Sequence, residues 1–200
     1  MIVAINETGD QHDKEGSPAL KIGIVAMYAA ACVGAGYMLI FIPNVEVYDM
    51  MVFLGGLLFG PGLGTIIAFT AELIHSIFNI YGASPLPLLL VQLLAYPLLG
   101  LAGGLLKNTR LRKTITKRSQ VVFGMIGLVF AFTYTILADI IWPIFGGLGT
   151  SIVLWVLQGM PLRIVLMACD FITFSMLLPL ILVAVEKHLA AIFPSQNKLD

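Results

Sequence analysis

The chain has 200 residues, of which 59% are hydrophobic and only 11% are charged, and its mean hydropathy is +0.99. Soluble domains carry about a quarter charged residues, so this composition excludes an ordinary soluble protein. The formal net charge is zero, which gives no indication of a nucleic-acid partner. We therefore expect an all-α integral membrane protein that crosses the cell (plasma) membrane several times, since each crossing helix needs about 20 apolar residues.

The apolar runs predict six transmembrane helices within a membrane domain of residues 21–188. The spans are expected at about residues 21–42, 46–60, 63–80, 86–106, 120–142 and 161–186. Residues 151–160 are apolar but too short to cross, and Pro161 is expected to separate them from the last helix. Whether they dip into the membrane is left open. The flanking residues 1–20 and 189–200 are predicted to be tails on the cytoplasmic side.

The stretch of residues 41–64 predicts a helical hairpin. Pro43 ends the first apolar run, because proline lacks an N–H group and disfavours helix at the residue before it. Asn44 and Glu46 then lie where the second helix is expected to begin, so helix capping is a sufficient explanation for both. Glycines around Pro61 allow a tight turn into the third helix.

The basic residues predict the orientation. The short loop 107–118 carries six basic residues and no acid, namely Lys107, Arg110, Arg112, Lys113, Lys117 and Arg118. Short loops rich in Lys and Arg stay in the cytoplasm. With six crossings, both termini are then cytoplasmic. Residues 43–46, 81–85 and 142–159 are expected outside.

Polar side chains within the spans predict a substrate site in the outer half of the membrane, because charges in a bilayer are costly and usually face a cavity or a partner. Glu72, His75 and Asn79 share one stripe of the third helix. The candidates are Asn44, Glu46, Glu72, His75, Asn79, Tyr81, Gln92, Asp139, Trp142, Gln158, Arg163 and Asp170. The alternative is an internal network that only holds helices together, such as Arg163 with Asp139 or Asp170. Aromatic residues at this depth are also typical of an interfacial belt.

Catalytic chemistry finds little support in the sequence. Glu72 and His75 form a Glu-x-x-His pair of the kind found in helical metal sites, but a second such pair is missing, so we predict no metal and no cofactor. No serine or cysteine has an identifiable base partner, and we predict that the chain is not an enzyme. The phosphate-binding pattern G-x-x-x-x-G-K-[ST] is also missing, so any coupling to ATP must come from partner proteins.

Small residues recur along the first predicted helix. Gly23, Ala26, Ala30 and Gly34 are spaced so that they share one face, and Ala31 and Ala35 lie beside them. Small residues at four-residue spacing let another helix approach closely. That helix is either one of the protein's own or belongs to a partner.

The chain resembles the substrate-binding S components of energy-coupling factor (ECF) transporters. The resemblance rests on IPNVE at residues 42–46, LLFGPGLG at residues 57–64 and the alanine-rich first helix. It implies a subunit that captures a vitamin or related micronutrient from outside, docks on a transmembrane coupling protein and two ATPases, and topples to release its cargo inside. In that family an Ala-x-x-x-Ala pattern meets the coupling protein. The resemblance therefore implies docking through Ala26, Ala30, Ala31, Gly34 and Ala35.

Cobalamin or another corrinoid is the first choice of cargo from this resemblance, with pantothenate, riboflavin, folate and a queuosine precursor as alternatives. The mixture of Arg163 with acidic residues suits a zwitterionic or amide-rich ligand, unless these groups pair with one another. Two other functions stay open. One is a stand-alone secondary transporter in which Glu72, His75 and Asp170 carry protons. The other is an intramembrane enzyme with a metal at Glu72 and His75.

Overall fold

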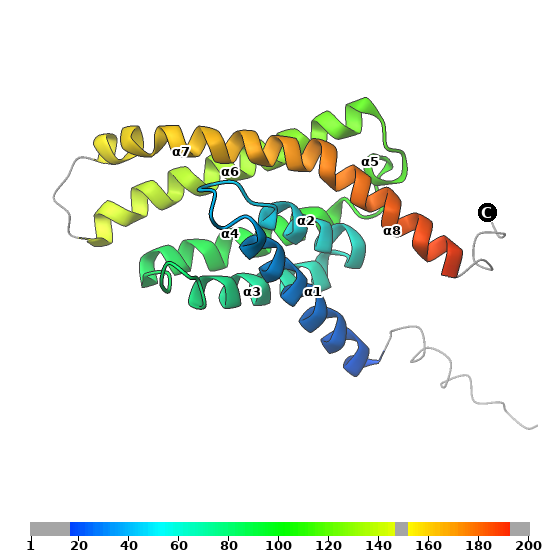
Figure 1. The fold of residues 1–200 in the computed structure, drawn as a ribbon. Coiled ribbons are helices and arrows are strands. Elements are labelled where there is room, and N and C mark those ends of the chain that lie inside the picture. Colours follow the sequence, from blue (N-terminus) through cyan, green and yellow to red (C-terminus); the bar gives the residue numbers. More distant parts are fainter. Residues whose placement is uncertain (1–16, 147–151, 193–200) are drawn as a thin grey trace, which may run out of the picture.

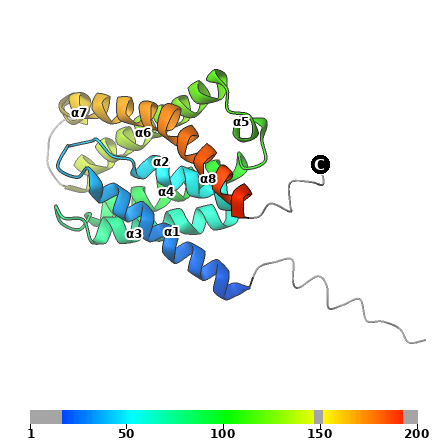
Figure 2. The same ribbon diagram turned by 45° about the vertical axis from the view of Figure 1, so that its right-hand side comes forward.

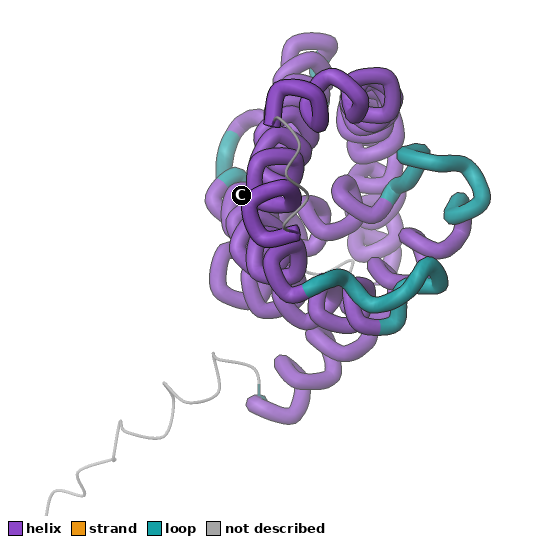
Figure 3. Tube along the Cα trace, turned by 90° about the vertical axis from the view of Figure 1, so that its left-hand side faces the viewer, coloured by secondary structure: helices purple, strands orange, loops and turns teal. Residues whose placement is uncertain are grey.

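The computed structural model describes residues 17–146 and 152–192, without the side chains of residues 142–144, 146, 152, 186 and 188–192. Within these residues the chain forms helices and loops but no strand (Figure 3). The elements are α1 (Pro18–Met38), α2 (Tyr48–Phe59), α3 (Pro61–Ile77), α4 (Leu86–Leu105), α5 (Arg110–Lys113), α6 (Lys117–Gly146), α7 (Ile152–Ile172), the π-helical turn η1 (Thr173–Leu177) and α8 (Leu178–Ile192). Most of the predicted tails at residues 1–20 and 189–200 lies outside the described part.

Four helical segments are long and apolar enough to cross a membrane, at Pro18–Met38, Leu86–Leu105, Lys117–Ile141 and Val153–Val185. Helices α2 and α3 are apolar but shorter. Large apolar side chains cover the outside. On α4, for example, Leu86, Leu90, Leu94 and Leu98 recur at every fourth residue and are each more than half exposed. Soluble proteins rarely expose such a stripe. The prediction of an all-helical fold is confirmed for the described residues, and four of its helical segments have the length and composition of membrane spans. Six crossings and the orientation stay predictions.

Helices α2, α3 and α4 pack backbone against backbone. The chain turns from α2 into α3 at Gly60 alone, whose positive φ of 92° suits glycine, and Pro61 then occupies the first turn of α3. This confirms the predicted hairpin. A Cβ atom at Gly56 would lie 2.1 Å from the carbonyl oxygen of Gly100 on α4, and one at Gly64 would lie 2.5 Å from the Cα of Gly56. Only glycine permits these contacts.

A second group is formed by α6 and the continuous helix of α7, η1 and α8, in which α7 and η1 run beside α6 while α8 continues beyond it (Figure 1). Gly127 on α6 faces the ring of Phe174, where an added Cβ would lie 2.7 Å away. Phe174 also packs on Phe53 of α2 at a ring-centroid distance of 5.3 Å. The aromatic ring thus joins the two groups of helices.

Several predicted helix ends are wrong. Pro161 lies inside α7, which begins at Ile152, so residues 152–160 are not separated from the last helix. Likewise α6 continues past residue 142 to Gly146. A proline removes one backbone hydrogen bond, and neighbouring groups compensate for this often enough in membrane helices that proline is tolerated there. Residues 147–151 of the intervening loop lie outside the described residues.

The capping interpretation of Asn44 and Glu46 is also wrong. Helix α1 ends at Met38, and the nine residues 39–47 form a loop before α2. The residue that caps α2 is Val47, which makes no side-chain capping bond. Asn44 instead adopts a left-handed backbone conformation with a φ of 59°, which asparagine tolerates better than most residues. Both side chains are therefore available for other contacts.

The two ends of the bundle carry different features. The start of α1, the short α5 and the end of α8 lie at one end, on the right in Figure 1. The α3–α4 connection and the facing ends of α6 and α7 lie at the other end (Figure 1). Helix α1 crosses the bundle obliquely against α3, as Figures 1 and 2 both show. The basic loop and the α3–α4 connection are thus at opposite ends, as the predicted orientation requires.

We predict that Gly100→Ala destabilises the protein because its Cβ would lie 2.4 Å from the carbonyl oxygen of Gly64. Overpacking of this kind typically costs about 1–3 kcal/mol. Thermal unfolding in detergent measures the effect. Gly62→Ala is the matched control, because a Cβ there meets nothing within 4 Å. Equal unfolding temperatures for both variants would show that the glycine contact does not limit stability.

Candidate functional site

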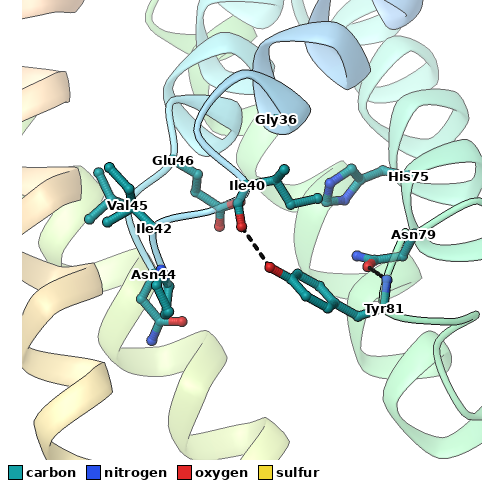
Figure 4. A pocket seen from close by; sticks show the side chains of 10 residues that line it. Gly36, Ile40, Ile42, Asn44, Val45, Glu46, His75, Asn79 and Tyr81 are labelled. Atoms are coloured by element: carbon teal, nitrogen blue, oxygen red, sulfur yellow. Dashed lines mark hydrogen bonds between the residues drawn. The ribbon is translucent and has the colours of Figure 1, made fainter.

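A cavity of about 390 Å³ lies where the end of α1, the loop 39–47 and the end of α3 meet. Figure 4 shows the loop residues on one side and His75, Asn79 and Tyr81 on the other. Its lining consists of Gly36, Ile40, Ile42, Pro43, Asn44, Val45, Glu46, His75, Asn79 and Tyr81. Small-molecule sites have volumes of about 300–1,000 Å³. The cavity is therefore large enough for a small ligand.

Two tyrosines tie the α1 side of the cavity to the α3 side. The Tyr81 hydroxyl donates to the carbonyl of Ile40 at 2.7 Å, and the Tyr37 hydroxyl donates to the carbonyl of Phe78 at 2.9 Å. The Asn79 side chain accepts a hydrogen bond from the Tyr81 backbone N–H at 2.9 Å, which fixes the turn that presents Tyr81. Figure 4 shows the Tyr81–Ile40 bond crossing the cavity.

The same loop is anchored to α7. The Asn44 side-chain amide donates to the carbonyl of Leu162 at 2.7 Å, and the Cys169 thiol contacts the carbonyl of Glu46 at 3.3 Å. These contacts use the side-chain amide of Asn44 and the backbone carbonyl of Glu46. The carboxylate of Glu46 is not part of them and faces the cavity (Figure 4). Loop 39–47 thus bridges the two groups of helices and forms one wall of the cavity.

The His75 imidazole forms the floor of the cavity, and two tyrosines pack against it. The ring stacks on Tyr48 at 4.5 Å between ring centroids and contacts Tyr37 at 5.2 Å. A Cβ at Gly36 would lie 3.1 Å from His75 Nε2, so glycine keeps α1 close to the imidazole. His75 is therefore held by packing, with part of its ring at the cavity.

Behind this floor lies a buried polar layer. The Ser76 hydroxyl contacts Glu72 Oε1 at 2.6 Å and Gln92 Oε1 at 3.1 Å, which joins α3 to α4. Tyr96 packs edge-on against Tyr48 at 5.3 Å. Glu72 is 1% exposed. The layer continues the polar stripe predicted on the third helix into the middle of the bundle.

Three carboxyl groups in this region lack a countercharge. Asp49, Glu72 and Asp170 are almost completely buried, and the structure gives none of them an ion pair within the described residues. Both oxygens of Asp49 and of Asp170 also lack a hydrogen-bond partner of good geometry, although the two groups interact across α2 and α7. Buried ionisable groups of this kind in membrane helices are commonly functional.

Arg163 and Asp139 form an ion pair between α7 and α6. Arg163 is only 3% exposed, and its second terminal nitrogen contacts the sulfur of Met160 at 3.3 Å. A Cβ at Gly159 would lie 3.0 Å from the Asp139 carboxylate, so glycine allows this approach. One of the two internal pairs considered from the sequence is therefore formed.

The predicted substrate residues lie in several different parts of the structure. Asn44, Glu46, His75, Asn79 and Tyr81 line the cavity. Glu72 and Gln92 lie in the polar layer, and Asp170 lies beside Asp49 at the α2–α7 boundary. Asp139 and Arg163 pair with each other, and Asp139 also lines a separate cavity of about 240 Å³ with Leu88 and Trp155. Gln158 is exposed. The Trp142 side chain lies outside the described part.

Sequence reasoning missed part of the site. Asp49 is not among the predicted site residues, yet it lies in the first turn of α2 and is completely buried. Its position in an otherwise apolar run was the available signal. Gly36 and Ile40 carry no chemical signal and reach the cavity only because α1 ends beside α3.

The predicted docking face of α1 is exposed. Ala26, Ala30, Ala31 and Gly34 are exposed and Ala35 is half-buried. A Cβ at Gly23 or Gly34 would meet nothing within 4 Å. The opposite side of α1, with Ala29, Cys32 and Gly36, is buried. Most of the small residues singled out in the sequence therefore do not serve packing within the described chain.

Within the described residues, no group of three or more His, Cys, Asp or Glu side chains could hold a metal ion. Comparison of the chain with protein-family models, with curated proteins and with solved structures gives no match. The features that bear on function are therefore the cavity, the buried carboxyl groups and the exposed face of α1.

We predict that Asp139→Leu destabilises the protein by about 3 kcal/mol, because it leaves the buried Arg163 without its countercharge. The double variant Asp139→Leu with Arg163→Met should recover most of this loss, since both charges are then gone. Thermal unfolding of the two variants and of Arg163→Met alone measures the coupling. A double variant no more stable than Asp139→Leu would show that the pair does not act as a unit.

Proposed function

We propose that this chain is the substrate-binding subunit of an ECF-type importer, which captures a vitamin or related micronutrient from outside and delivers it by docking with an ATP-driven module. The observation that carries the proposal is the cavity at the end of α1 and α3. It lies on the same side as the α3–α4 connection, which the charge distribution predicts to be outside. The IPNVE stretch of the resemblance forms one of its walls.

The chemistry of the cavity favours a ligand that donates hydrogen bonds or carries positive charge. Glu46 is the acidic residue of the lining, and Asn44 and Asn79 supply amide groups. Arg163 pairs with Asp139 and does not line this cavity. The sequence favoured a zwitterionic ligand because it combined Arg163 with acidic residues. The cavity lining does not contain this arginine.

The size of the cavity bears on the cargo. About 390 Å³ is near the lower end of the range for small-molecule sites, and this suits a vitamin of modest size. A corrinoid is much larger, so cobalamin would require loop 39–47 to separate from the α3–α4 connection. The Tyr81–Ile40 and Tyr37–Phe78 hydrogen bonds are the contacts that such an opening would break.

The exposed face of α1 is where the coupling protein is proposed to dock. Ala26, Ala30 and Gly34 would let a partner helix approach closely, since small residues favour tight contact between membrane helices. The two ATPases would act through that coupling protein. On this proposal the chain itself is a binding protein and not an enzyme.

A stand-alone proton-coupled transporter is the second candidate, and the buried Asp49, Glu72 and Asp170 favour it. Carboxyl groups inside a membrane protein are typical of proton pathways. The two functions differ in their energy source. Uptake by liposomes that contain this chain alone, driven by a proton gradient and insensitive to ATP, would support the second and contradict the first.

We predict that mass spectrometry of the detergent-purified chain identifies a bound small molecule, and that Glu46→Gln lowers its retention about tenfold or more. Burial raises the pKa of Glu46 to about 8, and a cationic group bound beside it would hold the carboxyl ionised. A hydrogen bond to a charged group contributes about 1.5–3 kcal/mol, and the amide keeps the shape but cannot ionise. Gln158→Ala is the control, because Gln158 is exposed outside the cavity. Retention that falls with Gln158→Ala but not with Glu46→Gln would place the ligand elsewhere.

We predict that Ala30→Trp prevents co-purification with the coupling protein while leaving ligand retention intact, because the indole would hold the partner helix away from α1. Leu180→Trp on α8 is the control, since it adds the same ring at an exposed apolar position. Pull-down and ligand retention are measured on the same preparations. Full assembly of Ala30→Trp would show that this face is not the docking surface.

A further inference from the structure

An apolar groove runs between α4 and α6 on the outside of the bundle. Its part nearer the basic loop has a volume of about 540 Å³. That part is lined by Leu98, Leu99, Ala102, Val121, Val122, Met125, Ile126, Val129, Phe130 and Thr133. A second part of about 370 Å³ continues it toward Ile141 and shares Leu98, Phe130 and Thr133. The proposed substrate site uses neither part.

The groove leads to a positively charged end. Arg118 lies one turn before Val122 and two turns before Met125, so the three residues share one face of α6. Arg110, Lys113, Lys117 and Arg118 are exposed. Arg112, in contrast, donates to the carbonyl of Lys107 within the loop at 3.2 Å. Lys117 and Arg118, at the start of α6, therefore lie at the mouth of the groove.

The start of α6 holds these cations in place. The Ser119 backbone N–H donates to Thr116 Oγ1 at 3.2 Å, and the Thr116 N–H donates to Ser119 Oγ at 2.7 Å. This reciprocal cap fixes the first turn, which contains Lys117 and Arg118. Basic side chains are unfavourable at the positive end of a helix, and a bound anion would offset that cost.

We propose that the groove binds an anionic phospholipid, with an acyl chain against Met125 and Val129 and the phosphate beside Arg118. The part from Val121 to Thr133 extends about 18 Å along the helix. That length matches one leaflet of a hydrocarbon core of about 30 Å. A lipid of the leaflet next to the basic loop thus fits both the length and the charge.

A partner helix fits this groove less well. Membrane helices associate through small residues that let backbones approach, whereas the rims of the groove carry the exposed side chains of Leu98, Met125 and Val129. A second helix would also gain nothing from the cations at the mouth. The small-residue surface of this protein lies on α1, away from the groove.

Native mass spectrometry of the detergent-purified chain tests the proposal with two probes, dioleoyl-phosphatidylglycerol and dioleoyl-phosphatidylcholine. We expect the anionic lipid to be retained and the zwitterionic lipid to be lost under the same conditions. Glycerol phosphate, which has the charge but no acyl chain, should not bind. Arg118→Gln should weaken retention of phosphatidylglycerol about fivefold, the effect of one basic residue near a charged surface. Met125→Trp should weaken it by filling the groove.

Two controls keep the test specific. Lys187→Gln removes a positive charge from an exposed position on α8, and Leu180→Trp adds an indole to the exposed apolar surface of the same helix. Both should leave retention unchanged. Equal retention of the two lipids, or phosphatidylglycerol binding that Met125→Trp does not alter, would overturn the proposal. So would a change in oligomeric state by Met125→Trp without a change in lipid retention, because the groove would then hold a helix.

Discussion

The contact on which the described fold depends is the backbone-to-backbone packing of α2, α3 and α4. Gly56, Gly64 and Gly100 lie so close that any side chain would collide with main-chain atoms. Because these helices touch at their glycines, their positions relative to one another are fixed along their length. The same contact therefore determines where Glu72 of α3 meets Gln92 of α4 through Ser76. Packing near one end of the bundle places the polar layer behind the cavity.

The second group of helices makes fewer contacts with the first group than α2, α3 and α4 make among themselves, and some of them involve the cavity wall. Phe174 packs on Phe53 in the interior. Nearer the cavity, loop 39–47 contacts α7 through Asn44 and through the carbonyl of Glu46. A movement of α7 relative to α2 would therefore move this loop. The cavity itself is lined by α1, loop 39–47, α3 and the residues after α3, so the second group is connected to it through this loop.

The sequence predicted the elements well and their ends poorly. Helix positions followed from apolar runs, and the Gly60 turn followed from its glycines and proline. Pro161 was misread because local rules treat proline as a helix end, while neighbouring groups in a membrane protein can satisfy the freed carbonyl. Asn44 was misread for a similar reason, since its role depends on Leu162, which is distant in sequence. Cavity residues without polar groups, such as Gly36, depend on tertiary packing and could not be predicted from sequence.

Under the proposed function, α1 connects the ligand to the partner. Its end contributes Gly36 to the cavity, the loop that follows contributes Ile40, and its exposed face carries Ala26 and Ala30. Tyr37 holds this end through its hydrogen bond to Phe78 and its contact with His75. A ligand that presses on His75 or breaks the tyrosine contacts would shift the end of α1. Because a helix moves as a stiff rod over a few turns, that shift would reorient the alanine face where the coupling protein is proposed to dock.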